Sequence, residues 1–133
     1  MTAAPVYLDS SALIKLVFEE PESAALERFL IEWPVRASSW LARVEVLRTA
    51  RTVRDAIVVR HADDVLAAVD LIAPDARLLV EATELEPFSL RALDAVHLAT
   101  ALSLQPDLAG VVVYDRRLSD AARAVGLTVW APA

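Results

Sequence analysis

The stretch AGVVVYDRRLSDAARAVGL, residues 109–127, decides the fold class because it passes from a strand straight into a helix. The run VVVY is apolar without interruption, which is typical of a strand buried on both faces. Asp115 ends this run, and RRLSDAARAVGL then takes up helical spacing until Gly126. A buried strand followed by a helix is the repeating unit of a parallel sheet covered by helices.

The rest of the chain repeats this alternation. Strands are predicted at residues 6–9, 35–38, 70–74, 109–115 and 128–132. Helices are predicted at residues 10–20, 22–33, 40–69, 75–85, 93–102 and 116–127, with the 40–69 segment dividing into two around residues 52–58 and Ser39 as its N-cap. The predicted fold class is therefore α/β, a three-layer α/β/α sandwich with a central parallel sheet, and residues 1–133 form a single domain.

Composition narrows the setting. Apolar residues make up 56% of the chain and charged residues 24%, which argues against disorder. The sequence has no cysteine, no targeting segment and no apolar run long enough for a membrane span, so we expect a cytoplasmic protein without a membrane partner. Its net charge of −6 has the wrong sign for binding nucleic acid through the overall field. Any nucleic acid must be bound by local basic groups.

Acidic residues follow the predicted strands. Asp9 ends the first strand and Asp115 the fourth, while Glu45 and Asp94 lie in helices beside the second and fourth strands. Ligands of open α/β sheets bind outside the carboxyl ends of the strands. We therefore expect these four carboxylates to converge at one end of the sheet.

Each of these acids also has an ordinary structural explanation. Asp9 and Asp115 precede helices and could serve only as N-caps. Glu45 lies three residues before Arg48, and Asp94 three residues after Arg91, so each could belong to a surface ion pair. Ser10 and Ser11 could simply start a helix, although a hydroxyl beside Asp9 could also hold a metal-bound water.

The segment LDAVHLATAL, residues 93–102, singles out Asp94. Apolar residues surround this aspartate on nearly every side of the predicted helix, and a buried carboxylate without a partner costs several kcal/mol. A metal ion would supply that partner. His97, one turn later, is more simply explained as a hydrogen-bonded core residue, although it could orient Asp94 or touch a substrate.

Several enzyme classes lack their motifs. With only Gly110 and Gly126, the chain has no glycine-rich dinucleotide-binding turn, and it has no G-x-S-x-G nucleophile elbow. An aspartyl phosphatase would need a second Asp where Ser11 stands. A site of carboxylate oxygens suits Mg²⁺ or Mn²⁺, whereas zinc is disfavoured without cysteine or a paired histidine motif.

Four motifs together resemble a known family. LDSSALIKL, VEVLR, LRALDAVHLATAL and VVVYDRRLSDAARAVGL occur in the order and spacing of PIN-domain proteins, specifically the VapC-type ribonuclease toxins of toxin–antitoxin modules. The resemblance covers essentially the whole chain. It implies a sheet of order 3-2-1-4-5 and an endoribonuclease whose one or two Mg²⁺ or Mn²⁺ ions are bound by catalytic Asp9, Glu45, Asp94 and Asp115.

The resemblance further implies an accessory hydroxyl at Ser10 or Ser11, a cognate antitoxin and a homodimer. Many relatives carry Thr or Ser where this chain has Val113, which puts hydroxyl support for Asp115 in question. Trp33, Trp40 and Phe18 could belong to an antitoxin-docking surface or to the core. The remaining alternative is a degenerate PIN-like domain that binds RNA or a protein without cleavage.

Contacts with RNA phosphates would fall to arginines near the acids. Arg accounts for all but one of the basic residues, Lys15 being the exception, and guanidinium groups suit phosphate. The candidates are Arg48, Arg51, Arg116 and Arg117, with Arg43 and Arg54 on the same helical segment. A solvated helix face explains each of them equally well.

Overall fold

The computed structural model describes residues 3–133 and contains one parallel five-stranded sheet of order β3-β2-β1-β4-β5. Its strands are β1 (Val6–Leu8), β2 (Arg36–Ser39), β3 (Asp70–Ile72), β4 (Gly110–Val112) and β5 (Val129–Trp130). Its helices are α1 (Ser10–Val17), α2 (Ser23–Ile31), α3 (Trp40–Thr52), α4 (Ala56–Ala67), α5 (Ala76–Glu84), α6 (Ala92–Leu102) and α7 (Arg116–Ala124). The α/β class, the parallel sheet and the strand order agree with the expectation.

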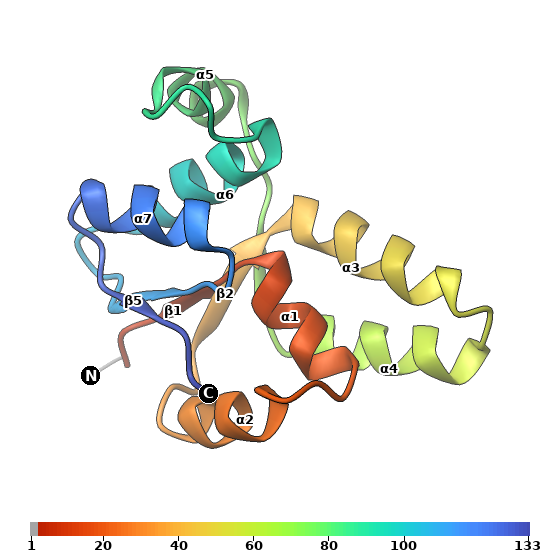
Figure 1. The fold of residues 1–133 in the computed structure, drawn as a ribbon. Helices are drawn as coiled ribbons and strands as arrows, with labels where there is room; N and C mark the ends of the chain where they lie inside the picture. The colour runs from red at the N-terminus through yellow and green to blue at the C-terminus, as the bar shows by residue number, and fades with distance from the viewer. Residues whose placement is uncertain (1–2) are drawn as a thin grey trace.

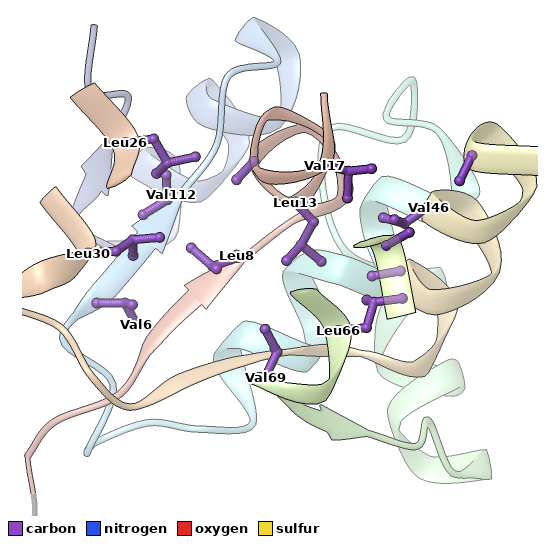
Figure 2. Close-up of a cluster of buried hydrophobic side chains, with 14 residues drawn as sticks. Val6, Leu8, Leu13, Val17, Leu26, Leu30, Val46, Leu66, Val69 and Val112 are labelled. Carbon is purple, nitrogen blue, oxygen red and sulfur yellow. The ribbon is translucent and has the colours of Figure 1, made fainter. Parts of the chain in front are cut away.

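The sheet divides the core into two apolar layers because side chains alternate along each strand. Val6, Leu8 and Val112 point toward α1 to α4 and form the larger cluster, which Figure 2 shows around Leu13, Leu26 and Leu66. Tyr7, Val111 and Val113 point to the opposite side, against α6 and α7. Helix α5 packs on α6, and α3 and α4 project from the sheet as a helical pair (Figure 1).

Several element boundaries differ from the sequence-based expectation. Helix α1 ends at Val17 and not at residue 20, because the buried Ser23 hydroxyl contacts the carbonyl of Lys15 at 2.7 Å and accepts the Glu20 amide at 2.9 Å. Strand β4 ends at Val112 and not at residue 115, because the Tyr114 amide donates to the Ser11 hydroxyl at 3.1 Å. A side-chain hydroxyl thus ends the helix at the first point and the strand at the second.

Other boundaries fall as expected. The 40–69 segment divides where Arg54 takes a positive φ of 58° between α3 and α4. Ser39 caps α3, accepting the Leu41 amide at 3.1 Å, and Gly126 follows α7 with a φ of 89°. Across residues 3–133, none of the helices is long and apolar enough to cross a membrane.

Candidate active site

A cavity of about 670 Å³ lies at the carboxyl ends of the central strands. All four predicted acids line it, and they come from different parts of the chain. Asp9 and Asp115 follow β1 and β4, Glu45 lies in α3, and Asp94 lies in the first turn of α6. The four carboxylates, which are distant in the sequence, thus line the wall of one pocket.

Asp9 is both an N-cap and a pocket residue. Its Oδ1 accepts the Ala12 amide at 3.0 Å and the Ser11 hydroxyl at 2.6 Å, and the residue is only 2% exposed. Burial raises the pKa of this carboxyl to about 6, although both hydrogen bonds act in the opposite direction. Asp9 Oδ1 therefore accepts the hydrogen bonds at the start of α1. These two hydrogen bonds only partly offset the effect of burial on the negative charge of the carboxylate.

Asp115 repeats this arrangement at the start of α7. Its Oδ1 accepts the Leu118 amide at 2.9 Å. Asp9 and Asp115 thus each cap a helix and also line the pocket. Because a cap uses one carboxylate oxygen, a second oxygen in each residue remains free of the hydrogen bonds that define the cap.

Asp94 lies half-buried beside Asp115. Burial raises the pKa of Asp94, and the negative charge of Asp115 raises it further. The expected local ion pairs are missing: within residues 3–133, neither the pair of Asp94 with Arg91 nor that of Glu45 with Arg48 forms. The pocket therefore holds like charges that lack a full complement of positive partners.

Glu45 is held through both of its carboxylate oxygens. Ser10 Oγ donates to its Oε2 at 3.1 Å, and His97 Nε2 lies 2.8 Å from its Oε1. His97 is itself buried, and its Nδ1 lies 2.6 Å from the Tyr7 hydroxyl. The side chain that His97 contacts is therefore Glu45, and not Asp94 as the sequence suggested. His97 is also a hydrogen-bonded core residue, as its structural explanation predicted.

The two serines have distinct tasks. The Ser10 hydroxyl donates to Glu45. The Ser11 hydroxyl donates to Asp9 and accepts the backbone amide of Tyr114, the residue before Asp115. Val113 takes no part in the pocket wall, because its side chain is 2% exposed and packs with Tyr7 and Leu98 beneath the sheet. The hydroxyl at this end of β4 is supplied by Ser11.

The donor chemistry of the pocket fits a hard divalent cation. Its acidic groups are all carboxylates, and the pKa values of Asp9 and Asp94 are raised, as expected of charges that lack a counter-ion. In the part of the chain that the structure describes, no three of these side chains already stand close enough together to hold one ion. Side-chain rotation at the free oxygens would have to complete such a site.

The basic residues around the pocket differ from those picked out in the sequence. Arg48, Arg51, Arg116 and Arg117 are exposed and do not line the cavity, whereas Lys15 and Arg91 do. Lys15 also pairs with Glu22 at 2.7 Å and lies over the Tyr114 ring. Arg91 shares a helical stripe with Asp94, and the structure places both residues in the cavity wall.

The aromatic residues considered for docking fall into two groups. Trp33 and Phe18 are partly buried against the larger core cluster, and the Trp33 ring packs 5.4 Å from that of Trp130. Trp40 is 47% exposed on α3, with the Arg43 guanidinium over its ring. Of the three, Trp40 alone presents a large exposed surface.

Comparisons with known proteins identify the family and support the fold. The PIN domain family model matches residues 6–124. The chain is 47% identical to the Mycobacterium tuberculosis protein named Ribonuclease VapC46, over 97% of this chain and 98% of that one. Two solved structures share the fold. M. tuberculosis VapC20, a sarcin-ricin loop cleaving toxin, has a TM-score of 0.73 at 14% identity over 92% of this chain and 96% of that one. A toxin–antitoxin complex from Klebsiella pneumoniae has a TM-score of 0.74 at 21% identity, over 96% and 98%.

Proposed function

The chain belongs to the PIN-domain family and is a homologue of the VapC ribonuclease toxins, and from this premise we propose that it cleaves RNA at the carboxylate pocket with bound Mg²⁺ or Mn²⁺. The observation that carries the proposal is the cavity itself, whose wall contains the predicted acids that follow β1 and β4 and those in α3 and α6, together with Glu20. Burial raises the pKa values of Asp9 and Asp94, and among residues 3–133 neither carboxylate forms a salt bridge. Such a site favours a divalent cation.

Each acid has a proposed role. Asp9, Asp94 and Asp115 would hold the main ion through their free oxygens, and Glu45 would hold a second ion or orient the attacking water. When bound, a divalent cation opposes the negative charge that builds up on the phosphate and makes water a better nucleophile. Lys15 and Arg91 stand in the same wall and would hold the phosphate in position.

The arginines outside the pocket would guide the rest of the RNA. Arg48 and Arg51 lie on α3, and Arg116 and Arg117 lie in the first turn of α7 directly after Asp115. All four are exposed, so they can reach phosphates on either side of the bond that is cut. With a net charge of −6, the protein depends on such local contacts.

We propose that the protein acts in the cytoplasm as the toxin of a toxin–antitoxin pair, with a cognate antitoxin as partner, and that it forms a homodimer. Co-expression with the product of the adjacent reading frame, followed by co-purification, tests the antitoxin. Light scattering of the purified chain tests the dimer. A monomeric mass across the micromolar range would contradict the homodimer.

The test of the activity pairs Asp94→Asn with Asp107→Asn. Asp107 is an exposed acid that precedes β4, at the opposite end of this strand from Asp115, so its loss changes the net charge equally without touching the pocket. We expect wild type and Asp107→Asn to bind Mn²⁺ in calorimetry and to cleave structured RNA until EDTA is added. Asp94→Asn should lose both properties. Equal cleavage by all three proteins would refute the proposal.

The alternative of a domain that binds RNA without cutting it has one observation in its favour. Within residues 3–133 the carboxylates are not preassembled around one point. Intact RNA that is retained by the Mn²⁺-loaded protein on a filter, across a panel of structured RNAs, would select this alternative. Cleavage that requires Asp94 would exclude it.

A further inference from the structure

A chain of buried polar groups runs from the core of the sheet to the pocket wall. It begins at Tyr7 in β1, passes through His97 in α6 and ends at Glu45 in α3. Tyr7 and His97 are each 1% exposed, and their rings meet edge to face at 5.8 Å between centroids. Hydrogen bonds buried this deeply are strong and hold their partners in one geometry.

The hydrogen-bond geometry of the three groups favours one arrangement of protons. The Tyr7 hydroxyl lies 2.6 Å from Nδ1 of His97 and can donate to that nitrogen. Donation from Tyr7 requires an unprotonated Nδ1 on His97. A proton on Nε2 can then be donated to Glu45 Oε1, which lies 2.8 Å away and, as a carboxylate oxygen, accepts.

Glu45 is thereby held from two sides. His97 in α6 donates to Oε1, and Ser10 at the start of α1 donates to Oε2. The glutamate side chain has three rotatable bonds and would otherwise sample many rotamers at the pocket rim. With both oxygens bonded, the Glu45 carboxylate in the cavity wall is held in one orientation.

We propose that His97 is a positioning residue that fixes the Glu45 carboxylate in the pocket wall, and that Tyr7 acts on it by holding the imidazole in the Nε2–H tautomer. This inference rests on the proposed function, because it assigns the geometry of one carboxylate of that same pocket. It gives His97 a task separate from that of Asp94 on the same helix. Hydrogen-bond partners of metal-binding carboxylates typically contribute 10-fold to 100-fold in metal affinity or activity.

The first test is made on the protein without metal or RNA. The chain has two histidines, and His61 is exposed, so a long-range ¹H–¹⁵N spectrum assigned with His97→Gln resolves the His97 ring. We expect a neutral ring protonated at Nε2 in wild type. Tyr7→Phe should populate a mixture of tautomers. A ring protonated at Nδ1 in wild type would overturn the proposal.

The second test compares two substitutions of the same residue. The amide nitrogen of Gln can occupy the place of Nε2 and donate to Glu45, whereas Leu fills the space without donating. We expect His97→Leu to lower Mn²⁺ affinity and the kcat of RNA cleavage by 10-fold to 100-fold with little change in KM for RNA. His97→Gln should recover both to within a few-fold of wild type.

Folding and function are separated by a double variant. Leu at position 97 removes the partner that lies 2.6 Å from the Tyr7 hydroxyl, so Tyr7→Phe/His97→Leu removes both members of this hydrogen bond and restores a matched apolar contact. We expect this protein to melt as cooperatively as wild type and still to show the loss at Glu45. Wild-type affinity and kcat in the folded double variant would overturn the positioning role. If Asp94→Asn also kept both, the proposed function itself would fail.

Discussion

Ser11 joins the two ends of the pocket, because its hydroxyl accepts the backbone amide of Tyr114, 103 residues away, at 3.1 Å. The same hydroxyl donates to Asp9 Oδ1 at 2.6 Å. One side chain thus ties the first acid to the segment that carries Asp115. No other contact described above connects these two acids so directly.

Ser11→Ala should therefore lower the stability of the protein and its Mn²⁺ affinity more than the loss of a single exposed hydrogen bond would. It leaves a buried carboxylate and a backbone amide each short of a partner, which costs about 1–3 kcal/mol of unfolding free energy. It also removes a bond that lowers the pKa of Asp9, so this pKa should rise. Urea denaturation and Mn²⁺ calorimetry measure the two effects. Ser103→Ala, which removes a hydroxyl bonded to the Thr100 carbonyl, is the control and should leave Mn²⁺ affinity unchanged.

The raised pKa of Asp9 predicts a pH-dependent stability in metal-free protein. The carboxyl releases its proton near pH 4 in the unfolded chain and near pH 6 in the folded one. Its contribution to the free energy of unfolding is therefore complete below about pH 4 and is lost as the pH rises through 6.

Asp9→Asn keeps the helix cap and removes this loss. In EDTA at about pH 7 the variant should be more stable than wild type by roughly 1–3 kcal/mol, and the gap should close toward pH 4. A gap of equal size at both pH values would contradict the assignment. In wild type, Mn²⁺ affinity should fall as the pH drops below about 6, because the proton competes with the metal.

Asp115→Asn separates capping from metal binding, with Asp75→Asn as a matched control. Both aspartates cap a helix by accepting an amide three residues on, at 2.9 Å in α7 and 2.8 Å in α5, but only Asp115 lines the active-site cavity. Asn is an equally good cap, so both variants should keep stability within about 0.5 kcal/mol. Only Asp115→Asn should lose Mn²⁺ binding and RNA cleavage. Parallel losses in both proteins would show that the helix cap, and not the charge, matters.

Arg91→Gln tests the phosphate contact. Arg91 lines the cavity, whereas Arg77 is an exposed arginine paired with Glu81 at 3.3 Å and serves as the control. Removing one phosphate contact should raise KM for RNA and reduce the salt dependence of binding by about one counter-ion. Filter binding at several salt concentrations measures this slope. An unchanged slope in Arg91→Gln would place the phosphate elsewhere.

Val113→Thr tests whether a hydroxyl at that position serves the site. The Val113 side chain packs in the core beneath the sheet, so a hydroxyl there should be buried and cost about 1–3 kcal/mol of stability. Mn²⁺ affinity should remain that of wild type. A gain in affinity would show that the hydroxyl reaches Asp115.

Local sequence signals explain why much of the fold could be predicted. The uninterrupted apolar run at Val111–Val113 and the N-cap residues Asp9, Ser39 and Asp115 act within a few residues of one another, so their effect is readable in the sequence. The boundaries that were wrong depend on side-chain hydrogen bonds that the hydrophobic pattern does not show. Helix α1 stops early because of Ser23, eight residues after Lys15, and β4 stops early because of Ser11, 103 residues before Tyr114.

In the pocket, too, the residues with local sequence signals could be predicted and those held by long-range contacts could not. The acids were predictable because each lies beside a strand end or on an apolar helix. Their partners were not, because Glu45 meets His97 across 52 residues and His97 meets Tyr7 across 90, with no local pattern linking them. Arg91 was weighed only as an ion-pair partner, since nothing in the sequence shows whether a guanidinium turns toward a neighbouring carboxylate or into a cavity.

The pairing of β1 with β4 has a consequence for synthesis of the chain. The ribosome releases Asp9 and Glu45 early, whereas Asp94 and Asp115 follow later, and β4 must then insert beside β1 before the four acids can meet. Under the proposed function, the chain can therefore begin to cleave RNA only after β4 has been synthesised and has paired with β1.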